Sequence, residues 1–281
     1  MQFDWSTLGA KSPTNLIKAR QLSHHALQWV TKAARANLEA APDDSHSSLE
    51  WDGERGVLFS QPLPTANGVV RVGLRVGGLA LVIMRDQHLL DTYELAGRRD
   101  SMVGVWLDSA LRALGLKPAG EVTLPYSIPS HPVARGTPYH LSGEAEALDE
   151  LARWFAAAAD LLAEVKTLHA GAGPIICWPH HFDIAMIVTL DASGSENARS
   201  IGIGVSPGDE YYAQPYVYIS PWPKLAVADL PLLPPPGHWH SQGFIGAVAT
   251  GEEIFTLEDR GPGLLAFVNS AFDIGRARLG I

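Results

Sequence analysis

The chain has 281 residues, of which 46% are hydrophobic and 18% charged, a globular rather than a disordered composition. A net charge of −9 and basic runs no longer than two residues argue against a nucleic-acid or anionic-membrane surface, so we expect neither partner. One cysteine, Cys177, excludes an internal disulfide. The first residues lack a signal-peptide pattern, and no apolar stretch is long enough to cross a bilayer, so we expect a cytoplasmic protein.

Helices are predicted wherever apolar residues recur three and four positions apart. This spacing predicts helices over about residues 15–40, 100–114 and 144–169, and a last helix that begins near Pro262. Pro42 ends the first of them. The helix over 144–169 has the most regular pattern.

Short extended segments follow each of the two long helices. Asp52-Gly53 and Asn67-Gly68 are hairpin-turn signals among them. Because these segments succeed one another without intervening helices, we expect mainly antiparallel sheets packed against long helices, which is the α+β class. The predicted strands are residues 48–51, 56–60, 69–76, 80–84, 174–177, 182–190, 200–205, 216–220 and 243–248.

The domain organisation predicted from composition is an N-terminal α+β half over residues 1–118, a Pro/Gly-rich connector over 119–143 and a C-terminal α+β half over 144–281. We expect the halves to pack as one unit. Both halves show a helix, about four strands and a helix, and Trp29 falls opposite Trp154 when the long helices are aligned. An internal duplication explains this order; the alternative is that any two Ala-rich amphipathic helices align as well.

Two histidine-containing segments are candidates for a metal site. His180, His181 and Asp183 stand at a turn into a strand, and His238 and His240 follow a Pro-rich loop. Side chains two apart on a strand share a face, so each pair could address one ion. Imidazole and carboxylate suit a divalent metal such as zinc, which would polarise water for hydrolysis. The alternative is that these side chains bond loop carbonyls or lie at the surface.

A turn and a set of aromatic residues accompany these histidines. Asp209 and Glu210 follow a Pro-Gly turn and are candidate acid/base groups; the alternative is a solvated turn. Aromatic rings with a few polar groups are typical of a small-molecule pocket, and equally of a core. The predicted pocket residues are Trp178, Tyr211, Tyr216, Tyr218 and Trp239.

The adjacent histidines His24 and His25 point about 100° apart on the first helix, so they do not form a chelating pair. We expect at least one of them at the surface or at an interface. Cys177 lies in an apolar strand and is interpreted as a buried, inert thiol. A nucleophilic role would require a thiolate-stabilising partner, for which His180 or His181 is the local candidate.

Three segments carry a family resemblance. WPHHFDIAMIVTL, SPGDEYYAQPYVYISPWP and GPGLLAFVNSAFDIG, at residues 178–190, 206–223 and 261–275, resemble an uncharacterised bacterial family that is catalogued as a domain of unknown function. In that family an x-Phe-Asp-(Ile/Leu)-Ala strand precedes a Pro-Gly segment, an aromatic strand and a Leu-Leu-Ala-Phe helix. ARQLSHHALQWVTK at residues 19–32 is similar to its first helix. The resemblance implies no reaction and no catalytic residue.

Two hypotheses of function follow. The first is a small-molecule-binding protein, with a metal-assisted hydrolase as its most specific form and the site among the five candidate ligands. The second is a non-catalytic binding or structural protein without a metal, whose aromatic residues fill a core or a subunit contact. The chain would be a monomer or a homodimer. The first hypothesis requires the segments around His181 and His240 to meet.

Overall fold

The computed structural model describes residues 2–191, 198–226 and 230–281, which form two compact units. The N-terminal unit holds residues 16–152 and 176–182; the C-terminal unit holds residues 1–15, 153–175 and 183–281. The predicted halves separate at the connector over residues 119–143. The observed units differ from them because the connector lies within the N-terminal unit. This unit also takes residues 144–152 and 176–182 from the predicted C-terminal half, and the C-terminal unit takes residues 1–15 from the predicted N-terminal half.

The N-terminal unit is built on an antiparallel sheet. Its strands run in the order β7-β1-β2-β4-β5-β6, and β3 pairs with β4. Their bounds are β1 (Leu49–Asp52), β2 (Val57–Ser60), β3 (Leu63–Thr65), β4 (Gly68–Arg75), β5 (Ala80–Arg85), β6 (His88–Glu94) and β7 (Ile176–Trp178). The buried side chains of Val57, Phe59, Val82 and Met84 form a cluster on this sheet.

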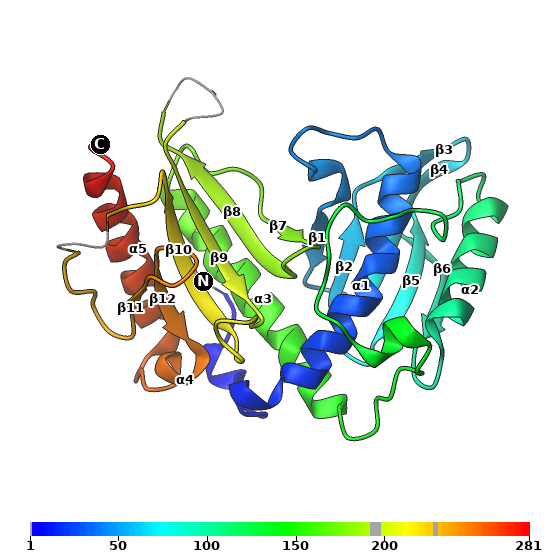
Figure 1. Cartoon of the computed structure of the whole chain (residues 1–281), viewed down its shortest axis with the longest axis horizontal. Helices are drawn as coiled ribbons and strands as arrows, with labels where there is room; N and C mark the ends of the chain where they lie inside the picture. Colours follow the sequence, from blue (N-terminus) through cyan, green and yellow to red (C-terminus); the bar gives the residue numbers. More distant parts are fainter. Residues whose placement is uncertain (1, 192–197, 227–229) are drawn as a thin grey trace. The chain divides into compact units, whose positions relative to one another are not determined.

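Helices cover this sheet. The helix α1 (Ile17–Asn37) packs against β2 and β4, as Figure 1 shows. Its Trp29 indole donates to Asp100 at the start of α2 (Asp100–Ala113) at 2.9 Å. The helix α3 (Ala145–Leu168) follows the connector; its residues up to 152 belong to this unit and those from 153 on belong to the C-terminal unit. The 3-10 turns η3 (Ser45–Ser47) and η4 (Pro132–Arg135) lie in the loops.

The C-terminal unit contains a second antiparallel set of strands, in the order β11-β12-β10-β9-β8. The helix α5 (Arg260–Arg278) packs against β9 and β10 (Figure 1). The short helix α4 (Gly251–Ile254) directly follows β12, and the 3-10 turns η1 (Trp5–Thr7) and η2 (Pro13–Asn15) belong to this unit. The strands are β8 (Asp183–Thr189), β9 (Ser200–Ser206), β10 (Tyr216–Trp222), β11 (His238–His240) and β12 (Gly246–Thr250).

The predicted α+β class with mainly antiparallel strands is confirmed. The long helices begin and end within three residues of their predicted bounds, whereas β3, β6, β11 and α4 were not predicted as elements. Each of these four is short or lies at a sheet edge, where the apolar pattern is weakest. The internal duplication stays a prediction. In the part of the chain that the structure describes, no helix combines the length and the apolarity needed to cross a membrane.

Candidate functional site

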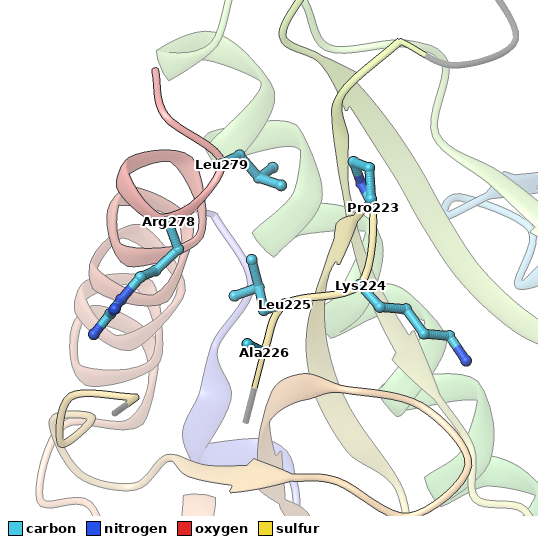
Figure 2. Close-up of a pocket in the computed structure, with 6 residues that line it drawn as sticks. All are labelled: Pro223, Lys224, Leu225, Ala226, Arg278 and Leu279. Atoms are coloured by element: carbon cyan, nitrogen blue, oxygen red, sulfur yellow. The ribbon is translucent and has the colours of Figure 1, made fainter. Parts of the chain in front are cut away.

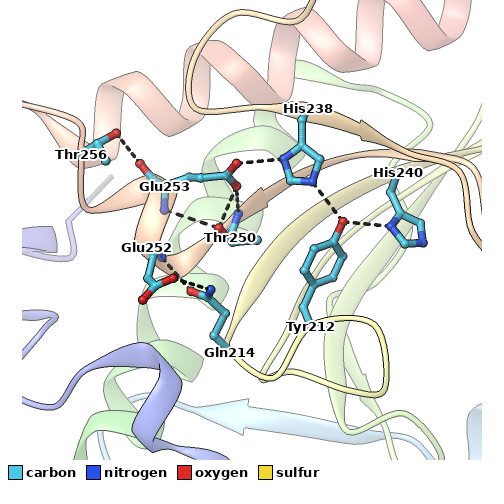
Figure 3. Close-up of polar contacts among 8 residues, drawn as sticks. All are labelled: Tyr212, Gln214, His238, His240, Thr250, Glu252, Glu253 and Thr256. Atoms are coloured by element: carbon cyan, nitrogen blue, oxygen red, sulfur yellow. Dashed lines mark hydrogen bonds and ion pairs between the residues drawn. The ribbon is translucent and has the colours of Figure 1, made fainter.

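Two histidines of the C-terminal unit converge on one tyrosine hydroxyl. The Tyr212 oxygen lies 3.0 Å from His238 Nε2 and 2.9 Å from His240 Nδ1 (Figure 3). The other nitrogen of His240, Nε2, lies 2.5 Å from the carbonyl oxygen of Gln242. The other nitrogen of His238, Nδ1, lies 3.0 Å from Glu253 Oε1. We call Glu253, His238, Tyr212 and His240 the tyrosine–histidine array.

The sequence positions the array through two local structures. His238 and His240 are two residues apart on β11, so their side chains leave the same face of the strand. Tyr212 is held by the turn that precedes β10, because Asp209 Oδ1 accepts the backbone N–H groups of Tyr211 and Tyr212 at 2.8 and 3.0 Å. The backbone N–H of Asp209 in turn donates to the Tyr212 carbonyl.

Glu253 belongs to the capping box at the start of α4. Its Oε2 accepts the backbone N–H and the hydroxyl of Thr250 at 2.8 and 2.7 Å, and the Thr250 hydroxyl accepts from the Glu253 N–H. Oε1 is the oxygen that faces His238 (Figure 3). The contact has the N···O separation of an ion pair, although the N–H direction falls short of hydrogen-bond geometry. One carboxylate therefore joins the helix start to the array.

Two tyrosine–aspartate pairs lie beside the array on β10. The Tyr216 hydroxyl donates to Asp209 Oδ2 and the Tyr218 hydroxyl donates to Asp183 Oδ2, each at 2.5 Å. The ring centroids of Tyr212 and Tyr216 are 4.9 Å apart, and those of Tyr216 and Tyr218 are 6.2 Å apart. Burial, followed by the bond to Asp209, raises the pKa of Tyr216 far above its ordinary value. The Tyr216 phenol therefore stays a protonated donor.

Aromatic rings enclose His240 and leave His238 more open. Phe244 stacks on His240 with centroids 4.2 Å apart, and the exposed ring of Tyr211 approaches it edge-on at 5.1 Å. The His238 side chain keeps 38% of its surface exposed. Burial raises the pKa of Tyr212, and the carboxylates of Glu253 and Asp209 raise it further. The array thus has a covered end at His240 and a solvent-accessible end at His238.

The N-terminal unit holds the other histidine candidates. The half-buried ring of His180 lies between Tyr126 and Trp178, with centroids 5.7 and 6.0 Å away, and against the exposed His181 at 4.2 Å. Burial, with a smaller contribution from the neighbouring His181, lowers the pKa of His180 to about 4. His180 is therefore a neutral imidazole in an aromatic frame at neutral pH.

Helix α1 anchors the turn that carries His180. The Pro179 carbonyl accepts from Gln28 Nε2 at 3.0 Å and lies 2.9 Å from His24 Nε2. Gln28 Oε1 accepts from the Tyr126 hydroxyl at 2.8 Å, and His24 stacks on Phe182. Burial lowers the pKa of His24 to about 4. His24 is therefore a buried anchor, not a surface group.

His25 anchors the connector to α1 in the same way, because its Nε2 lies 2.8 Å from the carbonyl oxygen of Pro129. Its ring also lies 5.2 Å from that of His131. We expected at least one of the adjacent pair at the surface or at an interface; His24 is buried and His25 is half-buried. The physical reason is that α1 is covered on more than one side, so both imidazoles meet loop carbonyls.

The five predicted metal ligands fall into both units: His180 and His181 into the N-terminal one, and Asp183, His238 and His240 into the C-terminal one. Over residues 2–191, 198–226 and 230–281, no three or more His, Cys, Asp or Glu side chains are arranged to hold a metal ion. The metal site therefore stays a prediction.

One spacing assumption behind the metal site is wrong. His181 lies in a turn and Phe182 has a left-handed φ of 60°, so residues 181 and 183 do not alternate as strand neighbours do. The strand β8 begins only at Asp183.

The predicted pocket and acid/base residues divide in the same way. Tyr211, Tyr216 and Tyr218 lie around the array, together with Asp209. Trp178 belongs to the N-terminal unit. Trp239 alternates with the two histidines on β11, and its indole donates to the Pro231 carbonyl at 2.7 Å. Glu210 is exposed to solvent on its turn, which fits the alternative of a solvated acid.

A shallow cavity of about 220 Å³ lies elsewhere in the C-terminal unit. In Figure 2 the charged ends of Lys224 and Arg278 extend away from the space between Leu225 and Leu279. The cavity contains none of the residues predicted from the sequence. Its lining residues are Pro223, Lys224, Leu225, Ala226, Arg278 and Leu279.

Sequence reasoning missed Tyr212 and Glu253, the two residues that join the histidines into one array. A signal for Glu253 exists, because Thr250-Gly-Glu-Glu253 has the Thr-x-x-Glu spacing of a capping box. No comparable signal separates Tyr212 from its neighbour Tyr211, since only the turn at Asp209 decides which hydroxyl lies between the two histidines.

No family model, no curated protein and no solved structure matches the chain.

Proposed function

We propose that this protein binds a small molecule at the tyrosine–histidine array of its C-terminal unit. The observation that carries the proposal is the convergence of His238 and His240 on the Tyr212 hydroxyl, at 3.0 and 2.9 Å. Small-molecule sites combine aromatic walls with a few precisely placed polar groups, and the ring of Tyr212, 6.0 Å from that of His238, supplies such a wall.

The open end of the array supports a ligand at His238 rather than at His240. His240 is almost fully buried and its Nε2 is engaged by Gln242, whereas the His238 side chain is partly accessible. A ligand group that replaces Glu253 or Tyr212 as the partner of His238 would form hydrogen bonds with a preoriented imidazole. An imidazole in this position is also the side chain best suited to transfer protons near neutral pH.

A fragment screen by NMR tests the proposal. We expect several compounds from a general library of carboxylates, amides, phenols and nucleosides to shift the ring signals of His238 and to leave those of His169 unchanged. His169 is a matched control, because it packs against Phe272 on α5 in the same unit. Tyr212→Phe should reduce these shifts. If compounds bind only elsewhere, or none binds, the array is a structural network and the non-catalytic alternative holds.

A metal-assisted hydrolase is the second candidate, and one observation favours it. Two imidazole nitrogens point at a single position, which is how a pair of histidines holds one ion, although Tyr212 occupies that position here. A divalent ion would need to displace the phenol and recruit further ligands. Elemental analysis of protein purified without chelators decides this candidate: stoichiometric zinc that disappears in His238→Ala supports it, and its absence rejects it.

A further inference from the structure

Two histidines connect helix α1 to the connector over residues 119–143 within the N-terminal unit. From α1, His25 Nε2 donates to the carbonyl oxygen of Pro129 at 2.8 Å, because a carbonyl can only accept. The ring of His131 lies 5.2 Å from that of His25, and the 3-10 turn η4, which begins after His131, packs against α1. Both rings are half-buried. We call His25 and His131 the connector histidines.

His131 caps the turn η4 in a way that depends on its protonation state. Its Nδ1 accepts from the backbone N–H of the buried Val133 at 3.3 Å, as the side chain of an N-cap residue does. This bond requires a lone pair on Nδ1. A neutral imidazole has that lone pair, whereas both nitrogens of an imidazolium carry protons. A proton on Nδ1 would therefore bring two N–H groups face to face and remove the cap.

The surroundings of His131 favour its neutral, acceptor form. Burial, with smaller contributions from the charges of His25, Arg135 and Lys18, lowers the pKa of His131. Lys18 is itself paired with Glu144 at 3.0 Å. A proton on His131 would thus add a positive charge near two side chains that are already positive.

The charges that act on His25 are of both signs. Burial lowers the pKa of His25, although its contact with Pro129 and the charge of Asp100 oppose this effect. The preceding residue, His24, interacts repulsively with His25 when both are charged. Two imidazolium rings 5.2 Å apart would also repel each other. Movement of the connector away from α1 relieves this repulsion and exposes both rings to water.

We propose that the connector histidines form a pH-sensitive switch, which holds residues 129–136 against α1 when both rings are neutral and releases them when the rings take up protons. Because the folded state favours the neutral rings, the contact is complete above about pH 6.5, the ordinary pKa of an imidazole, and weakens as the pH falls below it. The switch belongs to the N-terminal unit, so it is independent of ligand binding at the tyrosine–histidine array in the C-terminal unit.

The variant His131→Asn provides a sharp test, because asparagine keeps the cap and does not titrate. Its side-chain oxygen accepts a backbone N–H at an N-cap position as well as any residue does. In the same way, His25→Gln keeps a donor for the Pro129 carbonyl without a group that takes up a proton. His140→Asn is the matched control, since His140 is exposed in the same connector and lies outside the turn.

Amide hydrogen exchange measured by NMR, corrected for the intrinsic effect of pH on exchange, reports the opening directly. Between pH 7 and pH 5 the protection of the Val133 amide should fall about tenfold in the native protein and in His140→Asn. In His131→Asn it should fall less than about twofold, and His25→Gln should lie between the two.

The amide of Val82, on the strand β5 between β4 and β6, distinguishes local release from unfolding of the whole unit. Its protection should stay constant over the same pH range in all four proteins. An equal loss at Val133 in the native protein and in His131→Asn, no loss in the native protein, or a parallel loss at Val82 would overturn the proposal.

Discussion

The hydroxyl of Tyr218 reaches the carboxylate of Asp183 by passing over Gly204. Tyr218 and Asp183 lie on β10 and β8, and Gly204 on the intervening β9 stands directly opposite Tyr218. A Cβ atom at residue 204 would lie 2.5 Å from the Tyr218 hydroxyl. The bond across the strand therefore exists only because residue 204 has no side chain.

Gly204→Ala should destabilise the C-terminal unit by about 2–4 kcal/mol, because the methyl group displaces Tyr218 and disturbs its bond to a buried carboxylate. Urea unfolding measures this difference. In a Tyr218→Ala background the same substitution should cost at least about 1 kcal/mol less, since no ring remains to clash. Equal costs in both backgrounds would show that the close approach has no energetic consequence.

Tyr212→Phe removes the one hydroxyl that both histidines contact. It leaves two imidazole nitrogens without their present partner, so we expect a loss of about 1–3 kcal/mol in the free energy of unfolding. Tyr211→Phe is the matched control, because that ring is more exposed and should cost less than about 0.5 kcal/mol. A smaller loss for Tyr212→Phe than for the control would contradict the array as a source of stability.

The N-terminal unit should lose stability in acid. Burial lowers the pKa of both His24 and His180 from 6.5 to about 4, so the folded state favours their neutral forms. The stability that these two neutral histidines contribute to the folded state is complete above pH 6.5, the pKa of histidine in the unfolded chain. It declines as the pH falls from 6.5 toward 4. The charges that act on His24 are those of His25, Arg20 and His181, and the charges that act on His180 are those of His181, Asp44 and Arg35. Of these, only Asp44 raises the pKa of its histidine and so opposes the decline.

His24→Gln tests this acid sensitivity, since glutamine can still donate to the Pro179 carbonyl but does not titrate. Between about pH 6.5 and pH 5 the native protein should lose on the order of 2 kcal/mol more than this variant in urea unfolding. The expectation fails if both proteins respond equally to acid. His169→Gln should change the pH dependence of stability less. Burial lowers the pKa of His169 too, but its ring, in the C-terminal unit, is more exposed than that of His24.

The substitution Gly104→Ala in α2 has two opposite effects on the stability of the protein. Alanine favours a helix over glycine by about 1 kcal/mol, but its Cβ would lie 2.7 Å from the Trp29 ring. Trp29 is buried and tied to Asp100, so the ring has little room to move. Overpacking of about 1–3 kcal/mol should prevail, giving net destabilisation by thermal unfolding. In α5, Gly263→Ala meets the flexible end of Leu257 at 3.1 Å and should be neutral or stabilising.

The sequence predicts the elements that bury a repeated apolar face, because burial imposes the period. The helix α3 and the strand β8 follow from Leu151, Phe155 and Ile184 in this way. It does not predict β6, whose residues are largely exposed and therefore leave no alternating pattern. The histidines of β11 were singled out by their spacing alone. Their partner Tyr212 was not, since its placement depends on the backbone of the Asp209 turn.

The position of Gln28 requires a side-chain amide of the length of glutamine. Its side chain must donate to the Pro179 carbonyl and accept from the Tyr126 hydroxyl at the same time. A carboxylate cannot donate, an ammonium cannot accept and an asparagine is one methylene shorter. In natural variants of this chain, an exchange of Gln28 is therefore expected to occur together with a change at Tyr126 or in the turn over residues 178–182.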